Sequence, residues 1–314
     1  PTVILPAAPP QVVDGILESE GLSPDGRYIG FTLRPWPGFE EKAHIFAAAA
    51  DYAYEVIKTG KYDLFPDFAD NFVISKKHGI ESVVSINYGG DDLWKSQFNV
   101  SLLPAEIRQN SPGGNEGPSN ANSWIVPTEN LYKSFAEGDT RRDATIMKDF
   151  TYSDGSTLVF AESAKYPYYF CKFWDREAEP NGQNSNQNYP YMRYSELLLI
   201  YAEALNEVHD GPTTEAYDAI NKVRDRAFQD NGSGDHDLKN LDYAGFRKAV
   251  LDERRWELAL EGSRWFDLVR LSTDFAGEVK RAKPAAYVAG KHKLFPIPQY
   301  ERLLNKKITQ NDGY

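Results

Sequence analysis

The densest set of charged side chains in the sequence lies between Asp252 and Arg270. Glu253, Glu257 and Glu261 recur every four residues within it, so a helix would place their carboxylates along one face. Side chains one turn apart are separated by about 5–6 Å, which resembles the carboxyl spacing of a retaining glycosidase. The pattern therefore allows two interpretations: a hydrolytic site that uses Glu253 and Glu257, or a lattice of ion pairs.

The basic residues of the same segment favour the ion-pair lattice. A general acid needs a raised pKa, whereas neighbouring guanidinium groups lower the pKa of a carboxyl group. A scissile bond must also fit between the two carboxyls, which is difficult when both stand on one helix. We therefore assign no catalytic residue. The arginines that we expect to pair with the three glutamates are Arg254, Arg255, Arg264 and Arg270.

Other chemical signatures are absent from the sequence. There is no GxSxG, HExxH or Walker-type motif, and no two of the five histidines stand three or four residues apart. The single cysteine, Cys171, excludes a disulfide framework and a thiolate zinc site, and we expect it to be an unreactive core thiol. The acidic turn at residues 230–237 could offer oxygens to Ca²⁺ but fits no EF-hand template. We expect no metal and no cofactor.

Composition narrows the class of partner. Lys and Arg total 35 against 46 Asp and Glu, which gives a formal net charge of -11 over 314 residues. So acidic a chain repels phosphate backbones, and nucleic acid is excluded as a partner. We expect no signal peptide at the start, because residues 1–6 lack a basic and an apolar region. No apolar run is long enough to cross a bilayer.

Aromatic side chains in polar loops are the best candidates for a binding surface. Aromatic residues make up 13% of the chain, and a small group of them lies in or beside loops rich in Gly, Asn and Asp. Such rings can stack on the C–H faces of a sugar while nearby amides and acids bond to its hydroxyls. For each ring the alternative is a packing cluster beneath a long loop. The expected stacking residues are Trp94 and Trp124, with Tyr88 and Trp36, and the expected hydroxyl partners are Asn87, Asn122 and Asp91.

Hydrophobic periodicity indicates which elements carry these residues. Residues from Leu197 to Val208 show an apolar stripe at three- and four-residue steps, and Thr213 is placed to cap a second helix. From Ser195 to Phe228 is 34 residues, the length of a tetratricopeptide unit. The sequence predicts a mainly α protein: a tetratricopeptide-like scaffold of helical pairs, an alpha-alpha superhelix, with long irregular loops and minor β structure. As one domain it divides into irregular residues 1–39, a helix at 40–60, a loop-rich part at 61–190 that we expect to bind ligand, and helical motifs at 191–314.

Shorter patterns add detail within these parts. We expect β-like runs at residues 82–88 and 157–161, and helices near 242–260 and at 264–271. Two long polar loops stand out at residues 111–122 and 180–188. Long polar loops in a compact protein are commonly functional or disordered.

Several ordered motifs resemble those of the SusD/RagB family. Residues 191–207 are similar to its RYAE-LL-YAEALNE segment, and residues 219–224 to its AINKVR helix. Residues 253–270 resemble its ERR-E---EG-RWFDL-R block, and residues 294–314 its PIP--E---N---QN-GY ending. Residues 139–142 match its common D-RR sequence. The resemblance covers the C-terminal two thirds of the chain.

This resemblance implies a non-enzymatic, lipid-anchored protein on the extracellular face of the cell outer membrane. It would bind a glycan or oligosaccharide nutrient and deliver it to a SusC-like TonB-dependent transporter. The lipid anchor, its cysteine and much of the family's N-terminal helical region are expected to lie outside this sequence. Lys306 also stands where the family often has proline. Because the family's ligand residues lie in variable loops, none is transferred here by motif.

Two alternatives from other classes stay open on the sequence alone. One is a glycoside hydrolase that uses Glu253 and Glu257 or acids from the loops. The other is a helical scaffold whose only ligands are proteins. The function favoured over both is non-catalytic binding of a glycan at the cell surface.

Overall fold

A computed structural model describes most of the chain. The described residues are 15–22, 29–35, 39–89, 95–118, 120–176, 178, 185–271, 274–282, 288, 291–292 and 294–314.

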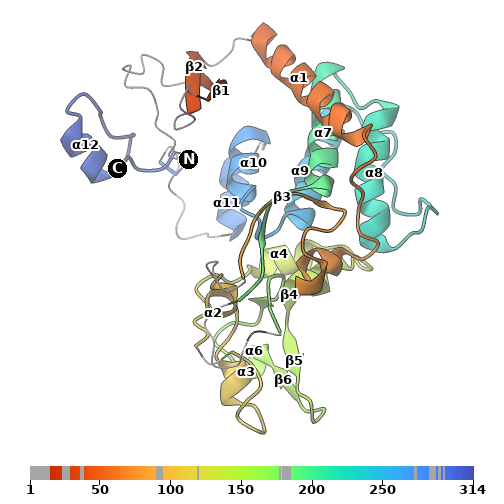
Figure 1. The fold of residues 1–314 in the computed structure, drawn as a ribbon, viewed down its shortest axis with the longest axis vertical. Helices are drawn as coiled ribbons and strands as arrows, with labels where there is room; N and C mark the ends of the chain where they lie inside the picture. Colours follow the sequence, from red (N-terminus) through yellow and green to blue (C-terminus); the bar gives the residue numbers. More distant parts are fainter. Residues whose placement is uncertain are drawn as a thin grey trace.

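A group of long helices forms one side of the molecule (Figure 1). Helix α7 (Tyr194–Val208) packs against α1 (Phe39–Ile57), α8 (Thr214–Phe228) and α9 (Tyr243–Glu257). Apolar side chains spaced along each helix meet in one core, where Leu199, Ile220 and Phe246 are fully buried. The predicted tetratricopeptide-like helical pair is thus confirmed, with α7 and α8 as its two members.

Local signals at the helix ends explain where these helices begin and stop. The Thr213 side chain accepts a hydrogen bond from the backbone N–H of Ala216, which confirms the expected cap of α8. Asp242 caps α9 in the same way through the N–H of Gly245. After α1, Gly60 has a φ of +61°, a backbone conformation that favours glycine.

The loop-rich part carries only short elements and lies at the opposite end from α1 (Figure 1). Three antiparallel strand pairs hold it together: β3 (Ser82–Ile86) with β8 (Tyr189–Arg193), β4 (Ile146–Met147) with β7 (Tyr169–Phe170), and β5 (Asp149–Thr151) with β6 (Thr157–Val159). The short helices are η1 (Phe68–Phe72), η2 (Ile74–Lys76), α2 (Phe98–Leu102), α3 (Glu106–Gln109), α4 (Glu129–Ser134), α5 (Arg141–Thr145) and α6 (Phe160–Ser163).

Aromatic residues supply the core of this part. Phe68, Phe72 and Phe173 pack edge to face in a buried cluster, with adjacent ring centroids 5.3 Å apart. Phe98 of α2 stacks on Phe173 at 4.8 Å and so ties α2 to the cluster. The core is therefore assembled from rings contributed by several short segments rather than from one periodic helix.

The C-terminal segment contains α10 (Arg264–Leu271), α11 (Phe275–Ala282) and α12 (Gln299–Leu304). The predicted helix at residues 264–271 is confirmed with the same bounds. Within the part of the chain that the structure describes, no helix combines the length and the apolar character that a membrane crossing requires.

The prediction that residues 1–39 are irregular is wrong for two segments. Strands β1 (Gly15–Leu22) and β2 (Ile29–Pro35) pair antiparallel. The sequence holds a signal for β2, because apolar Ile29, Phe31 and Leu33 alternate with other residues, which is the period of a strand. The Pro and Gly content of the surrounding chain obscured that alternation.

Candidate functional site

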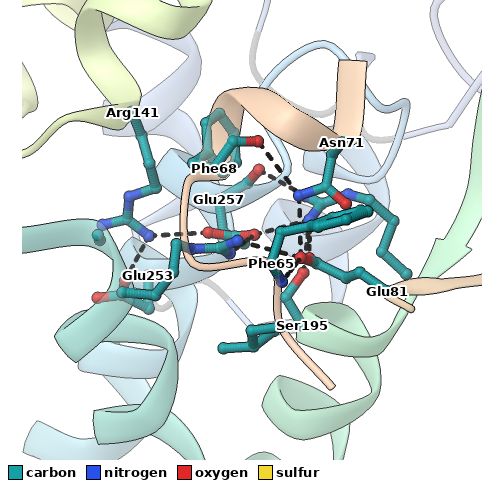
Figure 2. Close-up of polar contacts among 12 residues, drawn as sticks. Phe65, Phe68, Asn71, Glu81, Arg141, Ser195, Glu253 and Glu257 are labelled. Atoms are coloured by element: carbon teal, nitrogen blue, oxygen red, sulfur yellow. Dashed lines mark hydrogen bonds and ion pairs between the residues drawn. The ribbon is translucent and has the colours of Figure 1, made fainter. Parts of the chain in front are cut away.

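The regularly spaced glutamates lie in a buried network of ion pairs (Figure 2). Glu253 and Glu257 of α9 are fully buried, and Arg141 reaches both of them. Its Nη1 donates to Glu253 Oε1 at 2.6 Å and to Glu257 Oε2 at 3.2 Å. The sequence interpretation of these acids as an ion-pair lattice is therefore confirmed.

Glu257 is the centre of the network. Its Oε1 accepts from Arg193 Nη1 at 2.8 Å and from Arg226 Nη2 at 2.6 Å. Burial alone would raise the pKa of Glu257, but the positive charges of Arg226, Arg193 and Arg141 outweigh it and hold that pKa well below its usual value. A carboxyl group whose pKa is lowered in this way is ionised at neutral pH, so it is unsuited to act as a general acid.

The arginines that pair with these glutamates differ from the expected ones. Helical neighbours of the glutamates point to other faces of α9, so Arg254 instead pairs with Asp267 and Glu196 at 2.9 and 3.0 Å. Arg255 bonds to Asn130, Arg264 reaches Glu278, and Arg270 pairs with Glu203 and Asp267. The actual partners come from α5, β8 and α8: Arg141, Arg193, Arg224 and Arg226.

A buried lysine closes the network beneath Glu261. Lys172 Nζ donates to Glu261 Oε1 at 2.6 Å and to the carbonyls of Glu257 and Ala259. Burial lowers the pKa of Lys172 to about 8, although Glu261 opposes the shift. With Glu253 and Glu257 0% exposed, no sugar ring can approach them in the folded protein. The geometry therefore contradicts a hydrolase that uses this glutamate pair.

Two of the expected ligand residues, Asn87 and Tyr88, lie just after β3. Asn87 is exposed and its Oδ1 accepts from Ser85 Oγ and Asn188 Nδ2. The backbone of Tyr88 is fixed on both sides, because Lys77 Nζ donates to its carbonyl and its N–H donates to Asn188 Oδ1. Its half-buried ring contacts Phe98 of α2 edge to face, with centroids 6.3 Å apart.

Trp124 and Asn122 occupy a second loop, and Trp124 is the more informative of the two. Its side chain is 68% exposed, although an indole of this size is usually well buried. The loop is held by the N–H of Asn122 to the Val100 carbonyl at 2.8 Å and by Ile125 N–H to the Ser101 carbonyl at 3.2 Å. The backbone on both sides of Trp124 is therefore held against α2 while its ring faces solvent. The remaining expected residues, Trp94, Asp91 and Trp36, lie outside the described residues.

Helix α2 links these loops to a third one that sequence reasoning missed. Asn99 exchanges two hydrogen bonds with the backbone of Asp175, at 2.8 and 3.0 Å. Three loops therefore contact one short helix: two meet the side chains of Phe98 and Asn99, and the third meets the backbone carbonyl of Val100. The loops are those of Tyr88, of Trp174 to Arg176, and of Trp124.

A cavity of about 250 Å³ opens beside Asn99 of α2 and the Trp174 loop, and the residues that the sequence reasoning missed line it. Trp174 and Phe150 line it, with ring centroids 5.4 Å apart, together with Arg176 and residues 115–118 of the polar loop singled out in the sequence. Trp174 follows a run of aromatic residues, and the sequence analysis did not single it out. Its sequence neighbours Asp175 and Arg176 and the Asn-rich loop after them carry the pattern that had selected Trp94 and Trp124.

The acidic turn at residues 230–237 is organised by its own hydrogen bonds. Asp230 accepts from the N–H and the ring of His236, and Asp225 accepts from the N–H of Gly232. The His236 ring also stacks on Phe228 with centroids 3.9 Å apart. Among the residues that the structure describes, no three His, Cys, Asp or Glu side chains are grouped as a metal site would require.

A family model and curated relatives both match this chain to SusD-like proteins. A sequence model described as the SusD family matches residues 67–314. SusD-like proteins P2 and P25 of Formosa agariphila are 29% and 26% identical to the chain and match 86% and 87% of it. The chain spans about half the length of these curated relatives, covering 56% and 57% of them.

Solved structures share the fold. A SusD superfamily protein from Parabacteroides distasonis has a TM-score of 0.70 and 26% identity, over 87% of this chain and 58% of that one. Surface glycan-binding protein A from Bacteroides uniformis has a TM-score of 0.65 and 27% identity, over 87% and 57%.

Proposed function

The chain belongs to the SusD family, and from this membership we propose that it is a non-catalytic glycan-binding protein of the cell surface. The observation that carries the proposal is the indole of Trp124, 68% exposed on a loop whose backbone is fixed against α2. A preformed, exposed ring lowers the entropic cost of stacking against a sugar. The name of the B. uniformis protein, a surface glycan-binding protein, supports the same class of ligand.

In this proposal the glycan lies across the loops around α2. The rings of Trp124, Tyr88 and Trp94 stack on its sugar residues. Asn122, Asn87 and Asp91 bond to hydroxyl groups. Trp174 adds a ring in the neighbouring cavity, 250 Å³ in volume, which suits one part of a ligand rather than a whole oligosaccharide.

The wider role proposed for the protein is nutrient uptake. It would be held at the extracellular face of the outer membrane by an N-terminal lipid and pass its glycan to a SusC-like TonB-dependent transporter. Similarity of the sequence motifs to the SusD/RagB family supports this role. Pull-down of such a transporter by the protein tests it, and a transporter bound without any glycan affinity would favour the protein-only scaffold instead.

Affinity electrophoresis in gels that contain individual polysaccharides tests glycan binding. We expect a retarding polysaccharide to lose most of its effect on Trp124→Ala and Trp94→Ala, since a stacked ring contributes roughly 1–3 kcal/mol to such contacts. Tyr52→Ala is the matched control, because Tyr52 is 75% exposed on α1 and far from α2 (Figure 1). Unchanged mobility of both tryptophan variants, in a gel that retards the wild type, would contradict the assignment.

A reducing-sugar assay on the same polysaccharides separates binding from hydrolysis. We expect no turnover, because both paired glutamates are buried and the arginines around Glu257 hold its pKa well below the usual value. Turnover that disappears in Glu257→Gln, with the fold retained, would overturn the non-catalytic proposal.

A further inference from the structure

Arg176 lies at the cavity with its guanidinium group over an aromatic ring. Its Cζ is 4.3 Å from the centroid of Trp174, and the residue is exposed. A guanidinium group that rests on a ring face keeps its in-plane N–H donors for other partners. Trp174 thus orients Arg176 without using the donors that recognise an anion.

Those donors have no carboxylate partner within the described part of the chain. The acid that precedes Arg176 in the sequence, Asp175, is buried, and its Oδ2 accepts from Ser185 Oγ at 3.0 Å and Asn186 N–H at 2.9 Å. Its Oδ1 accepts from Ala178 N–H at 3.0 Å. Asp175 therefore accepts hydrogen bonds from residues of its own loop. By contrast, the structural arginines Arg141 and Arg193 form ion pairs with buried glutamates.

The other acid at the cavity is also engaged. Glu116 accepts from the Ser153 N–H with both carboxylate oxygens, at 3.2 and 3.1 Å, and from Ser153 Oγ at 2.7 Å. These donors offset part of its charge and hold the carboxylate at the wall formed by residues 115–118. The cavity therefore combines an apolar floor of Trp174 and Phe150, an oriented cation and an acid that is already hydrogen-bonded.

We propose that Arg176 is a specificity-determining residue that binds an anionic substituent of the glycan, a carboxylate or a sulfate ester. This inference rests on the proposed glycan-binding function and names the class of glycan. The planar fork of a guanidinium group matches two oxygens of either anion. Because the chain has a net charge of -11, its overall field repels an acidic polymer, so recognition must come from a local cation of this kind.

Isothermal titration with matched pairs of oligosaccharides tests the proposal. One pair is an oligogalacturonide and its methyl ester, which differ in the carboxylate. The other is a sulfated galactan oligosaccharide and its desulfated form, which differ in the sulfate. We expect the wild type to bind the acidic member of at least one pair about ten- to a hundredfold more tightly, which is the range for charge-assisted hydrogen bonds. Added salt should reduce the difference.

Substitutions of Arg176 then test whether this side chain causes the preference for the acidic oligosaccharide. Arg176→Gln should bind the acidic and neutral members with equal affinity, and Arg176→Lys should recover part of the preference for the acidic member. Arg142→Gln is the matched control, because Arg142 also lies over a ring, that of Tyr132 at 5.4 Å, but pairs with Asp143 away from the cavity. It should behave as the wild type.

The outcomes separate this inference from the proposed function. Equal wild-type affinity for both members of each pair, or a preference that survives in Arg176→Gln, would overturn the inference and leave glycan binding standing. Absence of binding to every oligosaccharide, acidic or neutral, would contradict glycan binding and the inference together.

Discussion

At the scale of single residues, Glu257 shows how a buried charge is retained. It is fully enclosed and bonds to three arginines that reach it from three different segments. Burying an ion carries a desolvation free energy, and attraction to its partners offsets that penalty only while all of them remain in place. The side chain therefore links α9 to α5, β8 and α8 and has a structural role rather than a reactive one.

Replacement of Glu257 by glutamine should therefore destabilise the protein. The substitution leaves Arg193 and Arg226 short of a buried counter-charge, for which we expect a loss of about 3–5 kcal/mol in the free energy of unfolding. Urea denaturation followed by circular dichroism measures it. The exposed Glu137 gives the control, and Glu137→Gln should lie within about 0.5 kcal/mol of the wild type. An equally small effect in Glu257→Gln would show that the network is not stabilising.

The same residue predicts how stability depends on pH. Because the pKa of Glu257 in the folded protein is well below its ordinary 4.5, its contribution is present above that value and is lost as the pH falls below it. Burial raises the pKa of Glu196 and Glu203, so their effect has the opposite sign. The difference in melting temperature between the wild type and Glu257→Gln separates the contribution of Glu257 from those of Glu196 and Glu203. We expect it to be largest near neutral pH and to shrink on acidification below about 4.5, and a constant difference would refute the assignment.

At the scale of elements, helix α2 positions the candidate site. Three successive residues, Phe98, Asn99 and Val100, each hold a different aromatic-bearing loop. Because α2 is only five residues long, its own backbone hydrogen bonds cannot stabilise it, and its packing on Phe173 must do so. The site is therefore coupled to the aromatic core beneath it.

Asn99→Ala tests this coupling. It removes both side-chain bonds to the backbone of Asp175, so we expect a loss of about 1–3 kcal/mol in stability and weaker retardation in a polysaccharide gel. Asn110→Ala is the control, because Asn110 is exposed and bonds only to its own turn, at the carbonyl of Glu106. If Asn99→Ala unfolds like its control and binds glycan like the wild type, α2 does not position the Trp174 loop.

Elements differ in how far the sequence predicts them. The helices from α7 to α10 follow from apolar periodicity and caps, because those signals act between residues three or four apart. The partners in the charge network do not follow, because Arg141 and Glu253 are 112 residues apart and only the folded chain brings them together. Trp174 illustrates the limit at the site. The sequence alone does not single it out, because whether its ring lines a cavity or fills the core depends on loops that carry no periodic signal.

At the scale of the whole molecule, the long helices and the loops of the candidate site lie at different ends (Figure 1). The packed helices α1, α7, α8 and α9 form the stable frame, and the buried charge network joins them to the loop-rich part (Figures 1 and 2). Many of the acidic residues that give the chain its net charge of -11 face solvent. Glu253 and Glu257 instead form ion pairs inside the buried charge network. If the loops bind glycan as we propose, their sequence could change the ligand specificity without disturbing the packed helices.

Amide hydrogen exchange with and without a retarding polysaccharide tests the central claim, that glycan binds around α2, most directly. Peptides covering residues 120–125 and 174–176 should gain protection when the polysaccharide is present, because their loops would lie beneath it. Peptides from α7 and α8 should exchange at the same rate in both conditions. Protection confined to the helices, with none in the loops around α2, would contradict the account.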